Sequence, residues 1–207
     1  MLVPPAIALA DGETATALRL LPADDHLAAT EPSRRNAAAL RAQVLFRAGD
    51  DDAARAALGP LLAGSERYHS EQLGVLGFAD VAVAALAEEP HARSLAAYLE
   101  VVPELRCYPL GGLGNPDVLR GALALRFGDL DAAEQHFRTG LEWASRPDVR
   151  FVVDQGRCLQ GLAEVAERRG DIETARTHLD AAGELFAKHG AKLYLDQVLA
   201  KKQFLKA

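Results

Sequence analysis

The sequence has little of what marks several classes of protein. Its 207 residues include only 2 cysteines, Cys107 and Cys158, too few for a disulfide framework or a zinc site. We expect both thiols to be reduced and separate. No apolar run approaches the ~20 residues of a membrane span. The apolar stretch 2–10 has no basic residue before it and contains two prolines, unlike a secretory signal. These absences predict a cytoplasmic protein that does not enter a membrane.

Positive charge is also scarce, since the formal net charge is −6. This charge argues against nucleic-acid binding, which needs a basic surface. All five lysines lie in residues 188–207, where Asp196 is the only acid. We interpret this segment as a solvated helix face with cations near its C-terminal end, and a binding surface for an acidic partner is the alternative.

No set of residues typical of catalysis is evident. The few serines lie outside any Gly-x-Ser-x-Gly motif, and the glycine-rich stretch 108–115 lacks the Lys-Ser/Thr of a phosphate-binding loop. His136 and His178 occupy equivalent repeat positions, but one pair on two helices lacks the spacing and third ligand of a metal site. We therefore expect neither an enzyme nor a bound metal or cofactor, and we interpret 103–115 as a connecting loop.

What the sequence has is alanine and leucine, two strong helix formers, arranged in four similar segments. Each segment carries an apolar run, a break, and a second apolar run. The breaks fall at Gly49, Glu89, Gly128 and Gly170, at intervals of 40, 39 and 42 residues. A regular interval of this length is typical of helical repeats. A weaker fifth copy is predicted at 14–21.

Each position of the pattern has a physical role. Glycine at the break tolerates the left-handed backbone that ends a helix, and the aspartate that follows it caps the next helix. Five residues after the break, a small side chain lets the two helices approach. Four residues further on, a large apolar side chain fills the space between repeats. These positions are Ala54, Ser94, Ala133 and Ala175 for the small residue, and Leu58, Tyr98, Phe137 and Leu179 for the large one.

These residues resemble the tetratricopeptide-repeat (TPR) superfamily, and the last copy, 159–179, resembles it most. The stretch 78–190 also resembles the C-terminal helical-repeat regions of large bacterial regulators that carry an ATPase or nucleotide-cyclase module. The resemblance implies an all-α fold over 1–207 as a single domain. That fold is a right-handed solenoid of four to five antiparallel helix pairs with a C-terminal capping helix. The predicted helices are 14–21, 32–48, 51–62, 71–88, 90–101, 116–127, 130–144, 148–169, 172–189 and 192–205.

The resemblance also implies a concave groove lined by the first helix of each pair. The groove is expected to be apolar in the middle and polar at its ends. Val83 and Ala122 stand where some TPR domains place a clamp for a terminal carboxylate, which disfavours that mode of binding. The predicted partner-binding residues are Gln43, Phe46, Arg47, Leu76, Val83, Leu86, Val118, Leu125, Arg126, Arg157, Gln160, Glu164 and Arg168.

The predicted helix 71–88 is apolar around its whole circumference, a pattern typical of a buried helix. In an open solenoid, Leu76, Val83 and Leu86 would face the groove and water. We therefore expect a second copy of the chain or a partner segment to cover this face, with residues 2–9 as the alternative cover.

Three functions fit these observations. The favoured one is a protein-interaction module that binds an apolar or amphipathic segment of a partner, self-association included. The second is a sensor domain that binds a small effector in the groove, for which an enclosed pocket is expected. The third is an unrecognised enzyme on a helical-repeat scaffold, for which titratable groups with shifted pKa values are expected in that pocket.

Overall fold

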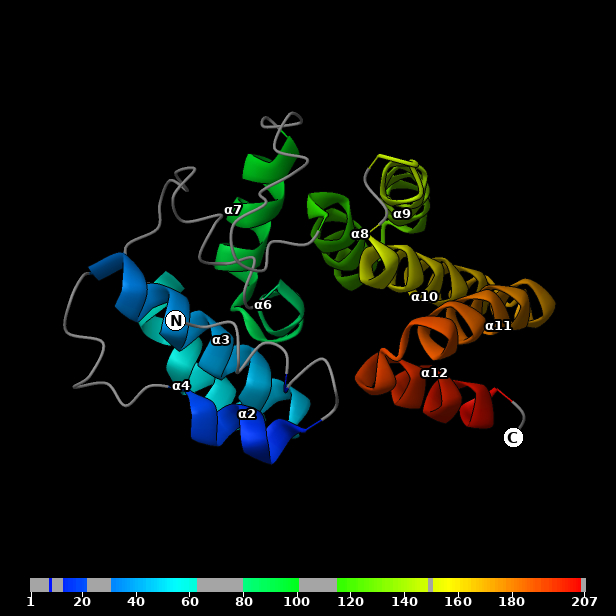
Figure 1. Ribbon diagram of the computed structural model, residues 1–207. Helices are drawn as coiled ribbons and strands as arrows, with labels where there is room; N and C mark the ends of the chain where they lie inside the picture. The colour runs from blue at the N-terminus through cyan, green and yellow to red at the C-terminus, as the bar shows by residue number, and fades with distance from the viewer. Residues whose placement is uncertain are drawn as a thin grey trace. The chain divides into compact units, whose positions relative to one another are not determined.

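The computed structural model describes residues 8, 13–21, 31–62, 80–100, 115–148 and 151–205, and all regular secondary structure within them is helical. Contacts divide the chain into two compact units. The described residues up to 100 belong to the first unit and those from 115 onwards to the second (Figure 1). Each unit is described by itself.

The first unit contains five described helices that bury mainly alanine, valine and leucine. Helices α3 and α4 pack along each other, α2 lies against α3, and α6 contacts both α3 and α4. The bounds are α2 Thr14–Leu20, α3 Glu31–Arg47, α4 Asp51–Leu62, α6 Asp80–Leu86 and α7 Glu89–Glu100.

The second unit is a run of helices in which each one packs against the next. Helix α10 lies at its centre, in contact with α8, α9, α11 and α12 (Figure 1). The bounds are α8 Pro116–Phe127, α9 Leu130–Ala144, α10 Val152–Arg168, α11 Ile172–His189 and α12 Lys192–Phe204. The all-helical prediction is confirmed for the described residues.

The turns that join paired helices share one hydrogen-bond pattern. Gly49, Gly128 and Gly170 all have a positive φ of 80–82°. At the first turn, the Asp50 N–H donates to Leu45 C=O at 3.0 Å and the Gly49 N–H donates to Phe46 C=O at 3.1 Å. This is the Schellman arrangement, which satisfies the last carbonyls of a helix, and the other two turns repeat it.

The aspartate after each of these glycines caps the next helix, as the sequence predicted. The Asp50 carboxylate accepts from the Ala53 N–H at 3.1 Å. Asp129 accepts from Ala132 and Asp171 from Thr174, both at 3.0 Å. A fourth turn, at Gly190, leads into α12, and there Ala191 offers no capping side chain.

Among the predicted packing positions that the structure describes, all except Ser94 are buried. The small residues Ala54, Ala133 and Ala175 have no exposed surface, whereas Ser94 is half-buried. The large residues Leu58, Phe137 and Leu179 are buried, and the Tyr98 side chain lies outside the described part. The burial confirms that these residues pack inside the units.

Two phenylalanines of the second unit lie against glycines of neighbouring helices. Phe137 on α9 lies against Gly121 on α8 and Gly161 on α10. Phe186 on α11 lies against Gly156 on α10 and stacks on Tyr194 of α12, with ring centroids 5.3 Å apart. A Cβ atom at any of these three glycines would come under 3.0 Å from the ring. The missing side chains therefore create the space that the rings fill.

Some sequence predictions need correction. Helix α10 begins at Val152 and not at 148, because residues 145–148 form the turn that follows α9. Val83 has no exposed surface in the single chain, so this side chain needs no partner to shield it from water, and coverage of the predicted face by a second copy or a partner segment stays a prediction. Leu86 is half-buried, and Leu76 and residues 71–79 of the predicted helix lie outside the described residues.

Single-domain organisation over 1–207 stays a prediction beside the two compact units. Cys158 is a free, buried thiol, and Cys107 and most of the predicted loop 103–115 fall outside the described part of the chain. Within that part, no helix combines the length and apolarity needed to cross a membrane.

Candidate functional site

The predicted partner-binding residues of the second unit lie on α8 and α10, which contact each other. Arg168 on α10 connects the two helices, because its Nη1 donates to the Leu125 carbonyl of α8 at 2.6 Å. Its Nη2 donates to Glu164 at 2.6 Å, one turn away on α10. The structure therefore brings the Leu125 carbonyl, Glu164 and Arg168 together.

The accessible part of this region is polar. Val118 and Leu125 are buried, whereas Arg126, Arg157, Gln160 and Glu164 are half-buried and Arg168 is exposed. We call the four half-buried residues and Arg168 the α8–α10 face. A partner that reaches this face meets charged and amide groups, because Val118 and Leu125, the apolar side chains predicted for this part of the groove, are buried.

In the first unit, the predicted residue Gln43 is buried, and its side-chain carbonyl accepts from the Ala82 N–H at 3.1 Å. Ala82 lies near the start of α6, where backbone N–H groups lack partners within the helix. Gln43 thus joins α3 to α6 and is satisfied within the unit. Phe46 and Arg47 are half-buried nearby on α3.

A buried polar network holds the start of α8 against α9 and α10. The Asn115 side chain caps α8 by accepting from Asp117 N–H at 3.0 Å, and its Nδ2 donates to the Gly140 carbonyl of α9 at 2.7 Å. The Asn115 backbone N–H donates to Asp154 Oδ2 of α10 at 2.9 Å. One residue therefore connects three helices by buried hydrogen bonds, which fix geometry because each lost partner is costly.

Charges complete this network. Arg120 pairs with Asp117 at 2.8 Å, and both side chains are buried. Arg157 lies 3.6 Å from Asp154. Cys158 is buried beside these groups, and its burial, with the nearby carboxylates of Asp154 and Asp117, raises the pKa of its thiol to about 12. A thiol with so high a pKa is a poor nucleophile at neutral pH.

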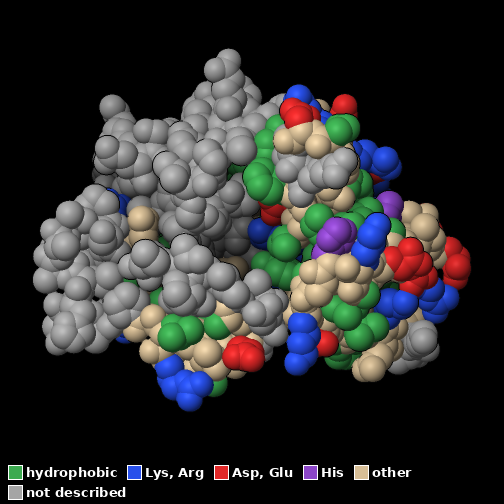
Figure 2. Space-filling view, in the orientation of Figure 1, with side chains coloured by type: hydrophobic (Ala, Val, Ile, Leu, Met, Phe, Trp, Pro, Cys, Tyr) green, Lys and Arg blue, Asp and Glu red, His purple; other side chains and the backbone are tan. Residues whose placement is uncertain are grey.

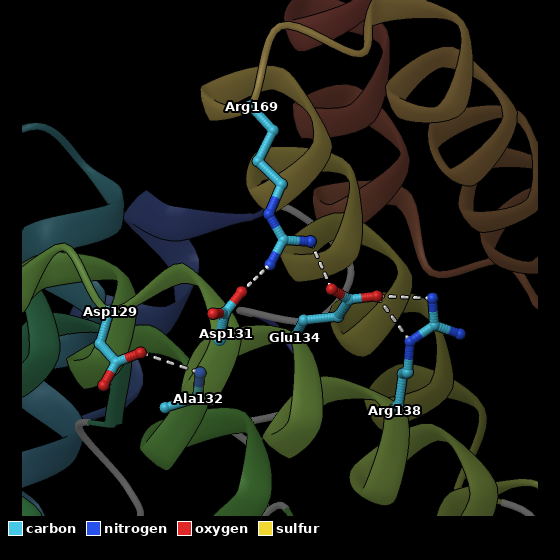
Figure 3. Close-up of polar contacts among 6 residues, drawn as sticks. All are labelled: Asp129, Asp131, Ala132, Glu134, Arg138 and Arg169. Carbon is cyan, nitrogen blue, oxygen red and sulfur yellow. Dashed lines mark hydrogen bonds and ion pairs between the residues drawn. The ribbon is translucent and has the colours of Figure 1, made fainter.

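A second cluster of charges, which the sequence reasoning missed, joins α9 to the end of α10 (Figure 3). Arg169, which directly follows α10, reaches two carboxylates in the first turns of α9, Asp131 at 2.5 Å and Glu134. Glu134 also accepts from Arg138 at 2.6 Å. Hydrogen bonds from Arg169 and then from Arg138 lower the pKa of Glu134. This cluster is exposed to solvent at its edges and links consecutive helix pairs.

The outer surface of α9 carries a shallow depression of about 360 Å³. It is open to solvent, and its described lining comes from this one helix: Asp131, Glu134, Gln135, Arg138, Thr139 and Glu142. Nearby on α11, burial lowers the pKa of His178, Arg138 lowers it further, and Glu134 and Asp171 oppose the shift. Among the described residues, no group of three or more His, Cys, Asp or Glu side chains is placed to hold a metal ion.

Acidic and basic side chains also lie next to each other over the end of the second unit where α10 passes into α11 (Figure 2). Arg176 and Glu173 are paired there at 2.9 Å. The two histidines that the sequence pattern relates, His136 and His178, are both half-buried. The charges in this region are mostly matched within the chain.

No family model matches the chain, and no curated protein is found to resemble it.

Proposed function

We propose that the chain is a cytoplasmic helical-repeat module of the TPR type. In this proposal α8 and α10, the first helices of the two pairs in the second unit, form a concave face for an amphipathic segment of a partner protein. The proposal is for binding and not for catalysis. In repeat proteins, consecutive units create extended surfaces of this kind.

The repeated turn supports the repeat assignment. The same Schellman bonds and the same aspartate cap recur at Gly49, Gly128 and Gly170. Buried alanines follow each turn at the same interval. The three turns lie 79 and 42 residues apart, close to two periods and one period of a repeat of about 40 residues, which is typical of repeat architectures.

The observation that carries the binding proposal is the direct contact between α8 and α10, the first helices of successive pairs. The Arg168–Leu125 hydrogen bond fixes this contact. Gln160, in the middle of α10, is half-buried on this face. Because the accessible side chains are polar, the partner segment must offer hydrogen-bonding or charged groups as well as an apolar side.

A sensor function would need an enclosed cavity with convergent polar groups, and the one depression described on α9 does not provide it. The depression on α9 is open and shallow, and it lies on the second helix of its pair.

Site-specific photo-cross-linking tests the binding proposal. A photoreactive amino acid replaces Gln160 on the α8–α10 face, and in a matched control it replaces Thr139 on α9, which is likewise half-buried. In the native cells, Gln160 should cross-link to one partner protein, at an amphipathic segment, and Thr139 should not. Equal products from both positions, or none from Gln160, would contradict the proposal.

A further inference from the structure

Helix α12 has an exposed face that differs from the exposed faces of α9 and α11. On α9, the exposed side chains are Asp131, Gln135, Arg138 and Glu142, all polar. On α11 they are polar apart from alanine. The described chain has four exposed large apolar side chains, and two of them, Leu199 and Phe204, are on α12.

The exposed residues of α12 follow the spacing i, i+4, i+7, i+8, i+11 and i+12, which places them on one side of a helix. We call this side the α12 stripe. It consists of Lys192, Asp196, Leu199, Ala200, Gln203 and Phe204.

The opposite side of α12 is already occupied. Val198 is fully buried in the cluster that contains Leu179 and Phe186 of α11, and Tyr194 and Leu195 pack against the same cluster. Figure 1 shows α12 at one edge of the second unit, beside α11. The helix therefore has apolar residues on two sides, and its own unit covers one of them.

The charges of α12 indicate what covers the other side. Lys201 is paired with Glu167 of α10 at 2.6 Å, and Lys202 is paired with Asp180 of α11. These lysines are directed to the flanks of α12 and neutralised within the chain. The stripe itself carries one cation, Lys192, and one anion, Asp196, so its net charge is zero.

We propose that the α12 stripe binds the same stripe of a second copy of this chain, in an antiparallel contact with two-fold symmetry. A neutral surface suits self-association, because two identical charged surfaces would repel each other, and a two-fold contact uses the same patch on both copies. With the axis between Leu199 and Ala200, Asp196 of each copy faces Gln203 of the other. The Gln203 amide donates to the carboxylate of Asp196.

This contact is separate from the α8–α10 face, so the proposed dimer and the proposed partner binding can each fail alone. Helix α12 has 13 residues and is about 20 Å long. A single helix pair of that length buries less than the ~800 Å² per partner of a standard interface, so the dimer is weak and forms at high protein concentration.

Sedimentation equilibrium in reducing buffer, from about 10 μM to about 1 mM protein, tests the proposal. For the wild-type chain, the mean mass should rise with concentration from 22.1 kDa towards twice that value. Leu199→Asp should keep the mass of one chain, because two carboxylates would meet at the axis. The matched control is Leu20→Asp on α2, since Leu20 is 45% exposed and Leu199 is 48% exposed, and it should associate like the wild type.

Two further samples keep the test decisive. Mixing Leu199→Asp with Leu199→Lys should restore association through opposite charges at the axis. If Leu199→Asp fails to fold by circular dichroism, Phe204→Gln reports on the same contact, because that side chain is 78% exposed. A wild-type chain that stays monomeric up to about 1 mM overturns the proposal. So does a folded Leu199→Asp or Phe204→Gln chain that associates like the wild type.

Discussion

The two units build their interiors from different side chains. In the first unit, the described core consists of alanine, valine and leucine, with Val44, Leu58 and Leu95 among its fully buried members. In the second unit, two buried phenylalanine rings are added: Phe137 lies against Gly121 and Gly161, and Phe186 lies against Gly156. A ring fitted against a glycine admits few alternative arrangements, whereas small aliphatic side chains can repack with less cost.

The units also differ in the polar contacts between their helices. In the described part of the first unit, the ion pairs Arg55–Asp52 and Arg93–Glu89 each join residues of one helix, and Gln43 provides a buried hydrogen bond between α3 and α6. In the second unit, Asn115 connects three helices through buried hydrogen bonds, and Arg169 connects α10 to α9. In the second unit, buried hydrogen bonds and ion pairs between helices add to the apolar packing that positions them.

Of the changes predicted here, Phe186→Ala should cause the largest loss of unfolding free energy, and it should do so in the second unit. Phe186 is fully buried, and removing a buried phenylalanine typically costs about 3–5 kcal/mol of unfolding free energy. Trp143, the only tryptophan in the chain, lies on α9 and reports on the second unit. Urea unfolding followed by its fluorescence should therefore shift to a lower midpoint.

Amide hydrogen exchange shows whether this loss stays in one unit. If the units unfold separately, exchange in Phe186→Ala should accelerate in α10, α11 and α12 and stay unchanged in α3 and α4. An equal acceleration in α3 and α4 would mean that the chain unfolds as one cooperative domain, as the single-domain prediction implies.

Adding a side chain at a glycine that contacts a phenylalanine ring should change the stability of the second unit less than Phe186→Ala does. In Gly161→Ala, the new Cβ would come under 3.0 Å from the Phe137 ring, and overpacking of this kind costs about 1–3 kcal/mol. The control is Gly183→Ala on α11, where the new Cβ meets Val198 at an ordinary 3.4 Å. There, the better helix propensity of alanine should stabilise the unit by about 0.5–1 kcal/mol.

Urea titration of both variants, followed by Trp143 fluorescence, measures the two free-energy changes. Opposite signs are expected. If both changes stabilised the unit, the space around Phe137 would be less important than helix propensity, and if both destabilised it, the propensity gain expected at Gly183 would be wrong.

The helix boundaries could be predicted from the sequence because local chemistry sets them. Gly128 and Asp129 end one helix and cap the next through bonds within a few residues, and α8, α9 and α11 have the predicted bounds. The start of α10 was placed too early. There, Phe151 stands at the cap position without a capping side-chain bond, so the usual sequence signal is missing.

The candidate site was less predictable, because burial depends on which helices meet. Hydrophobic periodicity shows that Val83 and Val118 lie on apolar faces, but it does not show which neighbours cover them, and both are buried. The Arg169–Asp131 pair joins residues 38 positions apart, and only the packing of α10 on α9 brings them together. The α12 stripe was also missed, since apolar residues on two sides of a helix leave no single stripe in the sequence.

The smallest expected effect is a pH dependence of the second unit that comes from His178. Burial lowers the pKa of this half-buried side chain, and the positive charge of Arg138 lowers it further. The unfolded chain, where histidine has a pKa of about 6.5, therefore binds the proton more readily than the folded chain. The stabilisation that neutral His178 contributes to the folded state is fully present above pH ~6.5 and is lost as the pH falls through the lower folded-state pKa. The pKa of Glu134 is also lowered, but a carboxylate loses its contribution at lower pH, below its usual pKa of about 4.3, so the two windows are distinct.

Urea unfolding between about pH 5 and pH 7, followed by Trp143 fluorescence, should show stability rising with pH in the wild type. His178→Gln should flatten this dependence, and the control His136→Gln should keep it. A slope that persists unchanged in His178→Gln would assign the pH dependence to another group.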